Sequence, residues 1–305
     1  MEITLNHDID SLNTRFAIPA RLRFHSDHAG FPVADITTAD ATACVALHGG
    51  QVLGWQPTGQ QPVIWVSKAA VYQPGKSVRG GVPICWPWFG AMAGQSAHGF
   101  VRNRPWQVRQ ASMTAADTVE LRLGLQDDAS TRALWDFAFD LELRVTVGAT
   151  LTMELVTRNR GEQPFSISEA MHTYFHVGDI HQTAVQGLDG TDYLDKVSNI
   201  APAHQTGAVR FDGETDRVYL NTTADCLIED PAWQRVIRIA KAGSTSTVVW
   251  NPWSEKEKNF ADMAAGEYKD MVCVETANAG GGSITVPPGG EHVLTAVIGV
   301  TASRG

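Results

Sequence analysis

Long apolar runs, paired cysteines and an excess of positive charge are all missing from this chain of 305 residues. No stretch reaches the roughly 18 consecutive apolar residues of a membrane-spanning helix, so the sequence predicts none. The first residues, MEITLNHDIDSLNTRF, are too polar for the apolar region of a signal peptide. We therefore expect a cytoplasmic protein with no membrane partner.

The few cysteines and the charge balance exclude two further classes. The four cysteines are widely scattered, and no two form a CxxC pair: Cys44, Cys85, Cys226 and Cys273. Buried, reduced thiols are their expected state. The net charge is -9, whereas a general nucleic-acid-binding protein is usually basic, so we expect no nucleic-acid partner. An anionic small molecule would need a local basic patch.

The main pattern in the sequence is an alternation of apolar and polar residues. Hydrophobic residues make up 43% of the chain and charged residues 19%, which excludes disorder and allows a large core. Apolar residues occupy every second position in 119–125, 141–147 and 151–155, with Gly148-Ala149 as a turn. This period predicts antiparallel strands with one buried face. Similar short runs lie at Val63–Val66, Val236–Ile239, Thr247–Trp250 and Val293–Val300.

Helical periodicity is weak, and its best candidate, Ser130–Phe137, is short. Strands and helices do not alternate, so a parallel α/β sheet is not expected. At about 150 residues per domain, the length of the chain would suggest two domains, but a β-sandwich longer than this often forms a single domain. No linker rich in Pro, Gly or Ser divides the chain. The sequence therefore predicts an all-β fold, one large antiparallel β-sandwich domain over residues 1–305.

Five segments concentrate residues that a plain strand does not need. They are Val78–Pro83 (VRGGVP), Ala97–Asn103 (AHGFVRN), Met171–His176 (MHTYFH), Val249–Trp253 (VWNPW) and Cys273–Asn278 (CVETAN).

His172 and His176 are spaced for zinc binding on a helix, but Thr173 stands where a metalloprotease has Glu. Thr173, Tyr174 and Phe175 favour a strand. On a strand the two histidines would lie about 13 Å apart, too far to bind one zinc ion. A hydrogen-bonded structural histidine and an acid/base histidine remain as interpretations of His172. Histidine suits proton transfer because its unperturbed pKa is about 6.5.

Charged residues in the other segments also have two interpretations. Glu275 follows Cys273 and Val274 at an apolar strand end, where a carboxylate is either paired or held in a cleft with a shifted pKa. Arginine suits phosphate because its planar fork donates two parallel hydrogen bonds. A candidate anion site therefore comprises Lys76, Arg79, Arg102 and Arg104, with Arg104 closest to an ordinary surface arginine.

Tryptophans flank two prolines, in Trp86-Pro87-Trp88 and in Trp250-Asn251-Pro252-Trp253. Packing of the core and loops is the usual reason for such clusters. Aromatic walls also suit the C–H faces of sugar rings.

Taken together and in this order, the five segments resemble the hexose-6-phosphate mutarotase branch of the aldose 1-epimerase family. The resemblance covers about residues 41–300 and leaves out roughly the first thirty. It implies the galactose-mutarotase-like supersandwich and no metal or organic cofactor. It also implies a phosphosugar substrate, with glucose 6-phosphate foremost, whose α and β anomers are interconverted through the open-chain aldehyde. The oligomeric state is left open, a monomer being plausible.

The resemblance also assigns roles to individual residues. His172 corresponds to the general acid and Glu275 to the general base. The substrate-binding residues carried over are Arg79, Arg102, Asp216 and His98. Ala97 stands where some members have glutamine, which puts the preferred sugar in doubt. A free-sugar mutarotase would not need the arginines, and a non-catalytic carbohydrate-binding module would not need both His172 and Glu275. A glycosidase would need a second suitable carboxylate.

Overall fold

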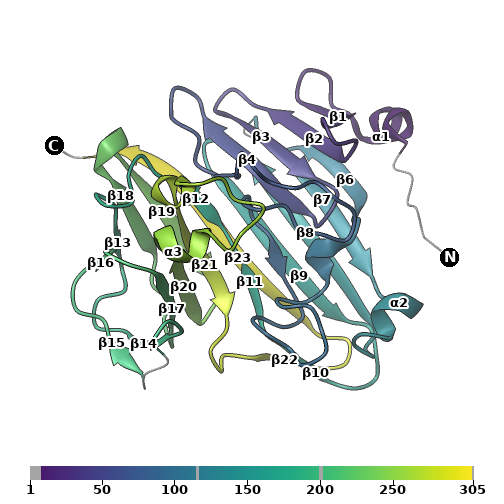
Figure 1. Cartoon of the computed structure of the whole chain (residues 1–305). Helices are drawn as coiled ribbons and strands as arrows, with labels where there is room; N and C mark the ends of the chain where they lie inside the picture. Colours follow the sequence, from purple (N-terminus) through teal and green to yellow (C-terminus); the bar gives the residue numbers. More distant parts are fainter. Residues whose placement is uncertain (1–7, 115–116, 199–201, 304–305) are drawn as a thin grey trace.

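The structure, a computed structural model, describes residues 8–114, 117–198 and 202–303. Two large antiparallel sheets dominate it, as the sequence predicted (Figure 1). The first, with nine strands, is ordered β16 (Val209–Arg210), β13 (Ala184–Gln186), β18 (Cys226–Asp230), β19 (Arg235–Ala242), β23 (Glu291–Ala302), β9 (Leu151–Asn159), β8 (Phe139–Val147), β7 (Val119–Gln126) and β6 (Gln107–Met113).

The second large sheet contains parts of three of the five segments singled out in the sequence, Met171–His176, Val249–Trp253 and Cys273–Asn278. Its order is β15 (Ala203–His204), β14 (Asp192–Asp195), β17 (Thr215–Tyr219), β20 (Ser246–Asn251), β21 (Met271–Asn278), β11 (Glu169–Met171) and β5 (Ile84–Cys85), and β12 (Tyr174–His176) also pairs with β21. A four-stranded sheet contains β1 (Leu22–Ser26), β2 (Pro32–Thr37), β3 (Ala41–Ala46) and β4 (Gln51–Pro57). A small ribbon pairs β10 (Phe165–Ile167) with β22 (Ile284–Val286).

Strand alternation explains the hairpins that the sequence predicted. In β9 and in the first five residues of β7 every second residue is buried, and β8 and β9 are joined across Gly148-Ala149 with Val147 opposite Leu151. Such a period-two pattern buries one face of the sheet. In β8 the outward-facing Asp140 and Glu142 are also buried, because Arg109 forms ion pairs with both.

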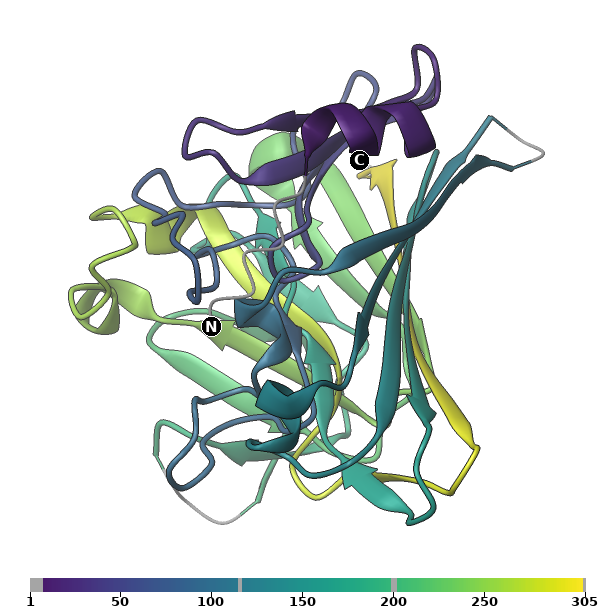
Figure 2. The same ribbon diagram turned by 90° about the vertical axis from the view of Figure 1, so that its right-hand side faces the viewer.

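The core lies between the layers. The long strands β7, β8 and β9 stand as one layer at the right of Figure 2, and the purple N-terminal hairpin strands cover its upper end. Trp86 is fully buried between the layers, where its indole contacts Phe139 at 4.6 Å between ring centroids and donates to Thr157 Oγ1. Apolar burial on this scale is the main stabilising contribution to such a fold.

Helices are few. α1 (Ile9–Phe16), α2 (Ala129–Arg132) and α3 (Trp253–Glu257) are short, as are the 3-10 helices at Val101–Asn103, Pro231–Trp233 and Glu267–Asp270. α2 overlaps only the first three residues of the predicted helical segment Ser130–Phe137. The run Val63–Val66 is not a full strand but makes isolated bridges, Ile64 to Phe175 and Val66 to Gly80. Across the described ranges, no helix is long and apolar enough to cross a membrane.

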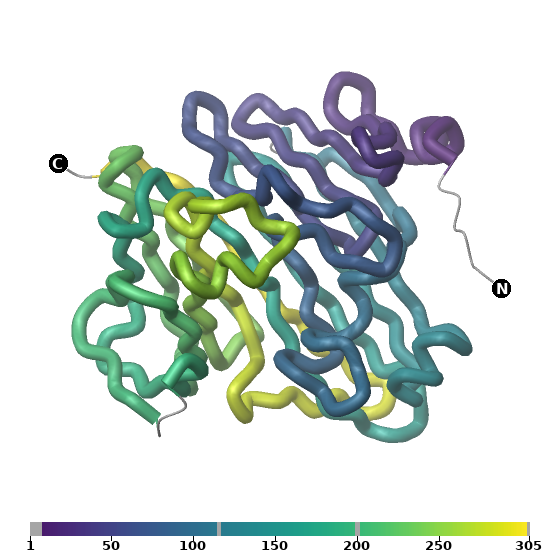
Figure 3. Tube along the Cα trace, viewed as in Figure 1, coloured from purple at the N-terminus to yellow at the C-terminus, as the bar shows by residue number. Residues whose placement is uncertain are grey.

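Two segments far apart in the sequence meet beside the second sheet. Figure 3 shows the yellow-green segment after β20 next to the blue segment that precedes β5. Glu267 joins them, because its carboxylate accepts hydrogen bonds from the Ser67 hydroxyl at 2.6 Å and from the Lys68 backbone at 2.9 Å. This contact brings residues 75–83 and 257–266 to the same end of the sheet.

Candidate active site

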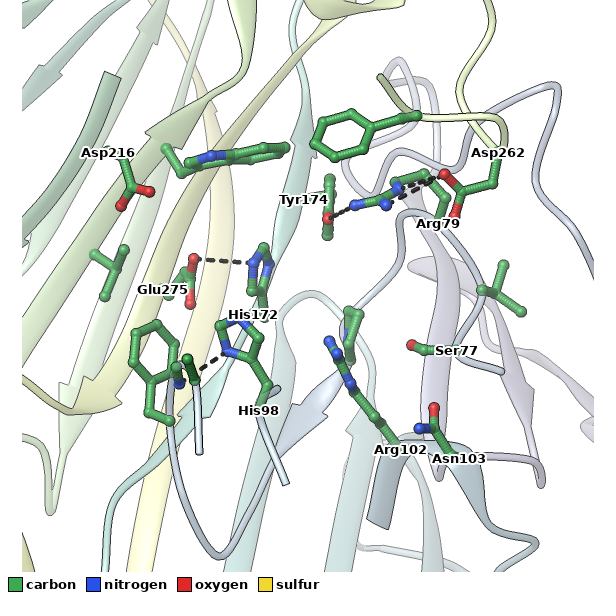
Figure 4. Close-up of a pocket in the computed structure, with 18 of the residues that line it drawn as sticks. Ser77, Arg79, His98, Arg102, Asn103, His172, Tyr174, Asp216, Asp262 and Glu275 are labelled. Atoms are coloured by element: carbon green, nitrogen blue, oxygen red, sulfur yellow. Dashed lines mark hydrogen bonds and ion pairs between the residues drawn. The ribbon is translucent and has the colours of Figure 1, made fainter. Parts of the chain in front are cut away.

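Strand register brings His172 and Glu275 together. Glu169 pairs with Asn278 and Met171 with Thr276, and beyond a break in strand pairing Tyr174 pairs with Cys273. The register is therefore continuous across the break, and His172 lies directly opposite Glu275. Cross-strand neighbours point to the same face of a sheet. The His172 Nε2 atom is 3.3 Å from the Glu275 Oε1 atom (Figure 4).

The adjoining strands complete this face. Val248 is opposite Glu275, while Trp250 is opposite both Cys273 and Asp216. Because side chains two residues apart on a strand share a face, Asp216 and Trp250 project to the same side as Glu275. Sequence analysis could not pair these residues, since the pairing depends on strand order.

These side chains line a cleft of about 760 Å³, a size typical of a small-molecule site. Lys76 lines it, and so do all six residues to which the resemblance assigned roles: His172, Glu275, Arg79, Arg102, Asp216 and His98. Several polar atoms here are buried and have no hydrogen-bond partner in the described part of the chain: Ser77 Oγ, Arg102 Nε, His172 Nδ1 and both carboxylate oxygens of Glu275. Buried polar atoms normally have partners, so this cluster is suited to a polar ligand.

The two arginines are held differently. Arg79 donates from Nε to Asp262 Oδ1 at 3.2 Å and from Nη1 to the Tyr174 hydroxyl at 3.2 Å. Its guanidinium also lies 4.5 Å from the centre of the Phe260 ring. Arg102 donates from Nη2 to the Ala97 carbonyl at 2.9 Å, and its buried Nε has no hydrogen-bond partner among the described residues. Figure 4 shows both arginines on one side of His172, with Asp216 on the other.

Glycines allow the approach that brings Arg79 beside Tyr174. Gly80 has φ +109°, and a Cβ there would lie 2.5 Å from the Trp65 carbonyl oxygen. Gly81 has φ +65°, and its Cβ would lie 2.5 Å from the Val52 carbonyl oxygen. Only glycine tolerates both the backbone angle and the closeness. The Tyr174 amide then donates to the Gly81 carbonyl at 3.0 Å.

Burial sets the protonation of the acid/base pair. It raises the pKa of Glu275 well above its ordinary value, and Asp216 adds to the effect while Arg102 opposes it. It lowers the pKa of His172 well below 6.5, helped by the neighbouring His98 and Arg102. Burial likewise lowers the pKa of His98 to about 4. All three effects disfavour the charged form of the buried group.

The sequence analysis did not identify several of the lining residues. They are Ser77, Asn103, Tyr174, Lys196, Lys256, Phe260 and Asp262. Ser77 and Asn103 lie close in sequence to Arg79 and Arg102, so proximity to the arginine motifs could have suggested them. Tyr174 lies inside the motif around His172. Asp262 and Phe260 come from a loop after α3 that has no local signal.

Other candidates lie elsewhere. The His176 ring packs against Trp233 at 4.8 Å, outside the residues that line the cleft. Arg104 donates to the Ser130 hydroxyl, which agrees with its interpretation as a surface arginine. Trp250 lines the cleft, whereas Trp86 is fully buried in the core. Within the described residues, no group of three or more His, Cys, Asp or Glu side chains is arranged to hold a metal ion.

Comparison with known proteins agrees with this geometry. Residues 33–299 match the aldose 1-epimerase family. A protein of Escherichia coli K12 with the provisional name glucose-6-phosphate 1-epimerase is 39% identical over 240 residues, 78% of this chain and 80% of that protein. A protein of the same provisional name from Cenchrus ciliaris is 36% identical over 256 residues, 81% of this chain and 78% of its own.

Solved structures show the same architecture. A protein of Salmonella typhimurium, provisionally named a mutarotase, superposes with a TM-score of 0.87 at 33% identity, over 98% of this chain and 100% of its own. A galactose mutarotase-like protein of Clostridium acetobutylicum shares the fold at 13% identity, with a TM-score of 0.68 over 92% of this chain and 98% of its own. The galactose-mutarotase-like fold is therefore confirmed. Because the family match extends through both large sheets and all the residues of the cleft described above, the chain belongs to the aldose 1-epimerase family.

Proposed function

We propose that this protein interconverts the α and β anomers of a hexose 6-phosphate, with glucose 6-phosphate as its main substrate. The observation that carries the proposal is the opposed pair His172 and Glu275, whose buried polar atoms lack partners, in a cleft that also contains Arg79 and Arg102. The provisional names of the relatives point to the same reaction.

The reaction needs one base and one acid beside C1 and the ring oxygen. Glu275 takes the proton from the C1 hydroxyl as His172 protonates the ring oxygen, so the ring opens to the aldehyde. Rotation about the C1–C2 bond turns the other face of the carbonyl to the C5 hydroxyl. The ring then closes as both protons return. Each positioned acid or base contributes about 10²–10⁴-fold.

For this cycle the pair has to hold one transferable proton in addition to the N–H proton of a neutral imidazole. A neutral His172 with a protonated Glu275, which burial favours, contains the same number of protons as an imidazolium with a carboxylate. Because His172 Nε2 and Glu275 Oε1 are 3.3 Å apart, the proton can pass from one group to the other when substrate binds, and no proton has to be exchanged with water. The two groups therefore titrate as one pair.

Binding residues hold the rest of the sugar. Arg102, with its free Nε, and Arg79 bind the phosphate, and this fixes the distant C1 near Glu275. Asp216 and a neutral His98 bind ring hydroxyls. The cycle uses only these side chains and the substrate, and we propose a small-molecule phosphosugar as the partner. We also propose that residues 1–305 fold as one domain.

Magnetisation exchange between the two anomers, measured by NMR, tests the proposal. Added protein should raise the exchange rate of glucose 6-phosphate far above that of the buffer alone, and above the rate that it produces with glucose. Equal catalytic efficiency on the two sugars would instead support a general free-aldose mutarotase. The ion pair between Arg79 and Asp262, which offsets one cationic charge, is the observation that favours this second candidate. No acceleration with either sugar would leave a carbohydrate-binding module.

A further inference from the structure

His172 lacks the usual means of fixing a catalytic histidine. Such a histidine is normally oriented by a hydrogen bond to its second ring nitrogen. Here Nε2 faces Glu275, and Nδ1 has no hydrogen bond of normal geometry to any other described residue, its one backbone contact being with His172 itself. Something else must hold the imidazole plane if Nε2 is to point at the substrate.

A stack of rings meets this need. The Tyr174 ring lies against the His172 ring, with centroids 4.9 Å apart and planes 20° from parallel. The Trp65 ring covers the other face of Tyr174, at 5.6 Å and 21°. Trp250 meets His172 and Tyr174 edge-on, at 6.1 Å and 6.0 Å. A ring confined between two others has one allowed plane, and the imidazole next to it shares that plane.

Tyr174 is itself held at its polar end. The residue is 4% exposed, and its hydroxyl accepts the hydrogen bond from Arg79 Nη1. Arg79 is fixed in turn by the Asp262 carboxylate and by the Phe260 ring (Figure 4). The ring therefore cannot slide along His172 without breaking this bond.

We propose that Tyr174 is the positioning residue for His172, setting the plane of the imidazole by ring stacking in place of a hydrogen bond to Nδ1. The inference rests on the proposed function, because it matters only if His172 transfers the proton. It assigns Tyr174 no contact with the reacting atoms. Its effect through His172 is therefore on the rate of the chemical step, whereas its hydroxyl acts on substrate binding only through Arg79.

Substitution of Tyr174 by Leu and by Phe separates stacking from the hydroxyl. Tyr174→Phe keeps the ring in the stack but loses the hydrogen bond from Arg79, so kcat for anomer exchange should fall by a smaller factor than in Tyr174→Leu. Tyr174→Leu removes the stack as well and should lower kcat by about 10–100-fold, the effect of a misplacement near 1 Å, with KM within about twofold of that of Tyr174→Phe. If Tyr174→Leu does not fold, Tyr174→Met replaces it, with the same expected result.

Tyr219→Leu is the matched control. Tyr219 is fully buried in the same sheet, faces away from the cleft and donates to Gln205. Its loss should cost stability but leave kcat near that of the parent. A fall in kcat as large as that of Tyr174→Leu would overturn the proposal, because it would trace the effect to general destabilisation.

A spectroscopic measurement tests the stack directly. The His172 ring protons, assigned from the resonances missing in His172→Asn, should lie upfield in the parent and in Tyr174→Phe. They should return downfield in Tyr174→Leu. A rise in KM with kcat unchanged would make Tyr174 a substrate contact and refute the positioning role.

His172→Asn in the same assay distinguishes failure of the positioning role of Tyr174 from failure of the acid role of His172. A slow His172→Asn with a fully active Tyr174→Leu overturns the positioning role alone. A fully active His172→Asn overturns the acid assignment, and the positioning role with it.

Discussion

Replacing Glu275 by Gln should remove catalysis and stabilise the protein at the same time. The side chain is 1% exposed, and apart from the His172 Nε2 atom, 3.3 Å from Oε1, neither carboxylate oxygen has a potential hydrogen-bond donor among the described residues. Glutamine keeps the shape of the side chain but cannot take a proton from the C1 hydroxyl. Anomer exchange should therefore fall by at least about 10²-fold, the lower end for loss of a general base.

The gain in stability depends on pH in a direction that the structure fixes. Burial raises the pKa of Glu275 above its unfolded value, so the native state holds this proton more tightly than the unfolded chain. Stability from this group is present below the unfolded pKa, near 4.3, and declines as pH rises toward the folded pKa. Glu275→Gln removes that decline, so its advantage over the parent should grow between pH 5 and pH 8.

The size of the gain follows from the unpaired burial. An unsatisfied buried polar group costs about 1–3 kcal/mol, and a charged one costs more. Glutamine still has the cost of a buried neutral polar group but not the extra cost of a buried charge. The free energy of unfolding of Glu275→Gln should therefore exceed that of the parent by at least about 1 kcal/mol at pH 8. At about 2.1 cal/mol/K per residue, this corresponds to a rise in Tm of roughly 1.5–2 °C for a chain of this length.

Thermal melts at pH 5 and pH 8, together with NMR exchange, provide the measurement. Glu169→Gln is the matched control, because Glu169 is also fully buried in this sheet but is paired with His292 at 2.9 Å. It should lose stability and retain exchange. A difference in Tm between the parent and Glu275→Gln that is the same at both pH values would refute the argument from burial. Anomer exchange by Glu275→Gln at the parent rate would refute the assignment of Glu275 as the base.

Three further outcomes are expected. His172→Asn should slow exchange as Glu275→Gln does, and the double variant should lose less than the product of the two, since groups acting as one unit are not additive; full additivity would contradict a shared proton. Arg102→Ala should reduce kcat/KM by about 10–150-fold for glucose 6-phosphate, the equivalent of a charged hydrogen bond, with little effect on glucose; an equal loss on both sugars would contradict phosphate binding. Burial lowers the pKa of His98 to about 4, so His98 is neutral above pH 5. His98→Asn should therefore lower kcat/KM without shifting the pH dependence of kcat/KM between pH 5 and 8. A shifted pH dependence would show that His98 titrates in the reaction.

The sequence by itself determined the fold class. Alternation in 119–125, 141–147 and 151–155 is a local signal, because side chains of a strand point to opposite faces in turn. The order of the five motifs was enough to indicate the family, and the six residues to which the resemblance assigned roles line one cleft. The short run Val63–Val66 shows the limit of this signal, since four apolar residues did not form a strand of their own.

Only the tertiary structure decided which residues act on one another. His172 and Glu275 meet because an unbroken register places β12 and β11 beside β21, and no local pattern encodes a register between segments about a hundred residues apart. The partner of Arg79, Asp262, comes from a loop after α3 that touches the segment before β5 only in the folded chain. The protonation states of His172 and Glu275 could not be predicted from the sequence either, because they depend on how completely the assembled sheets exclude water from Glu275.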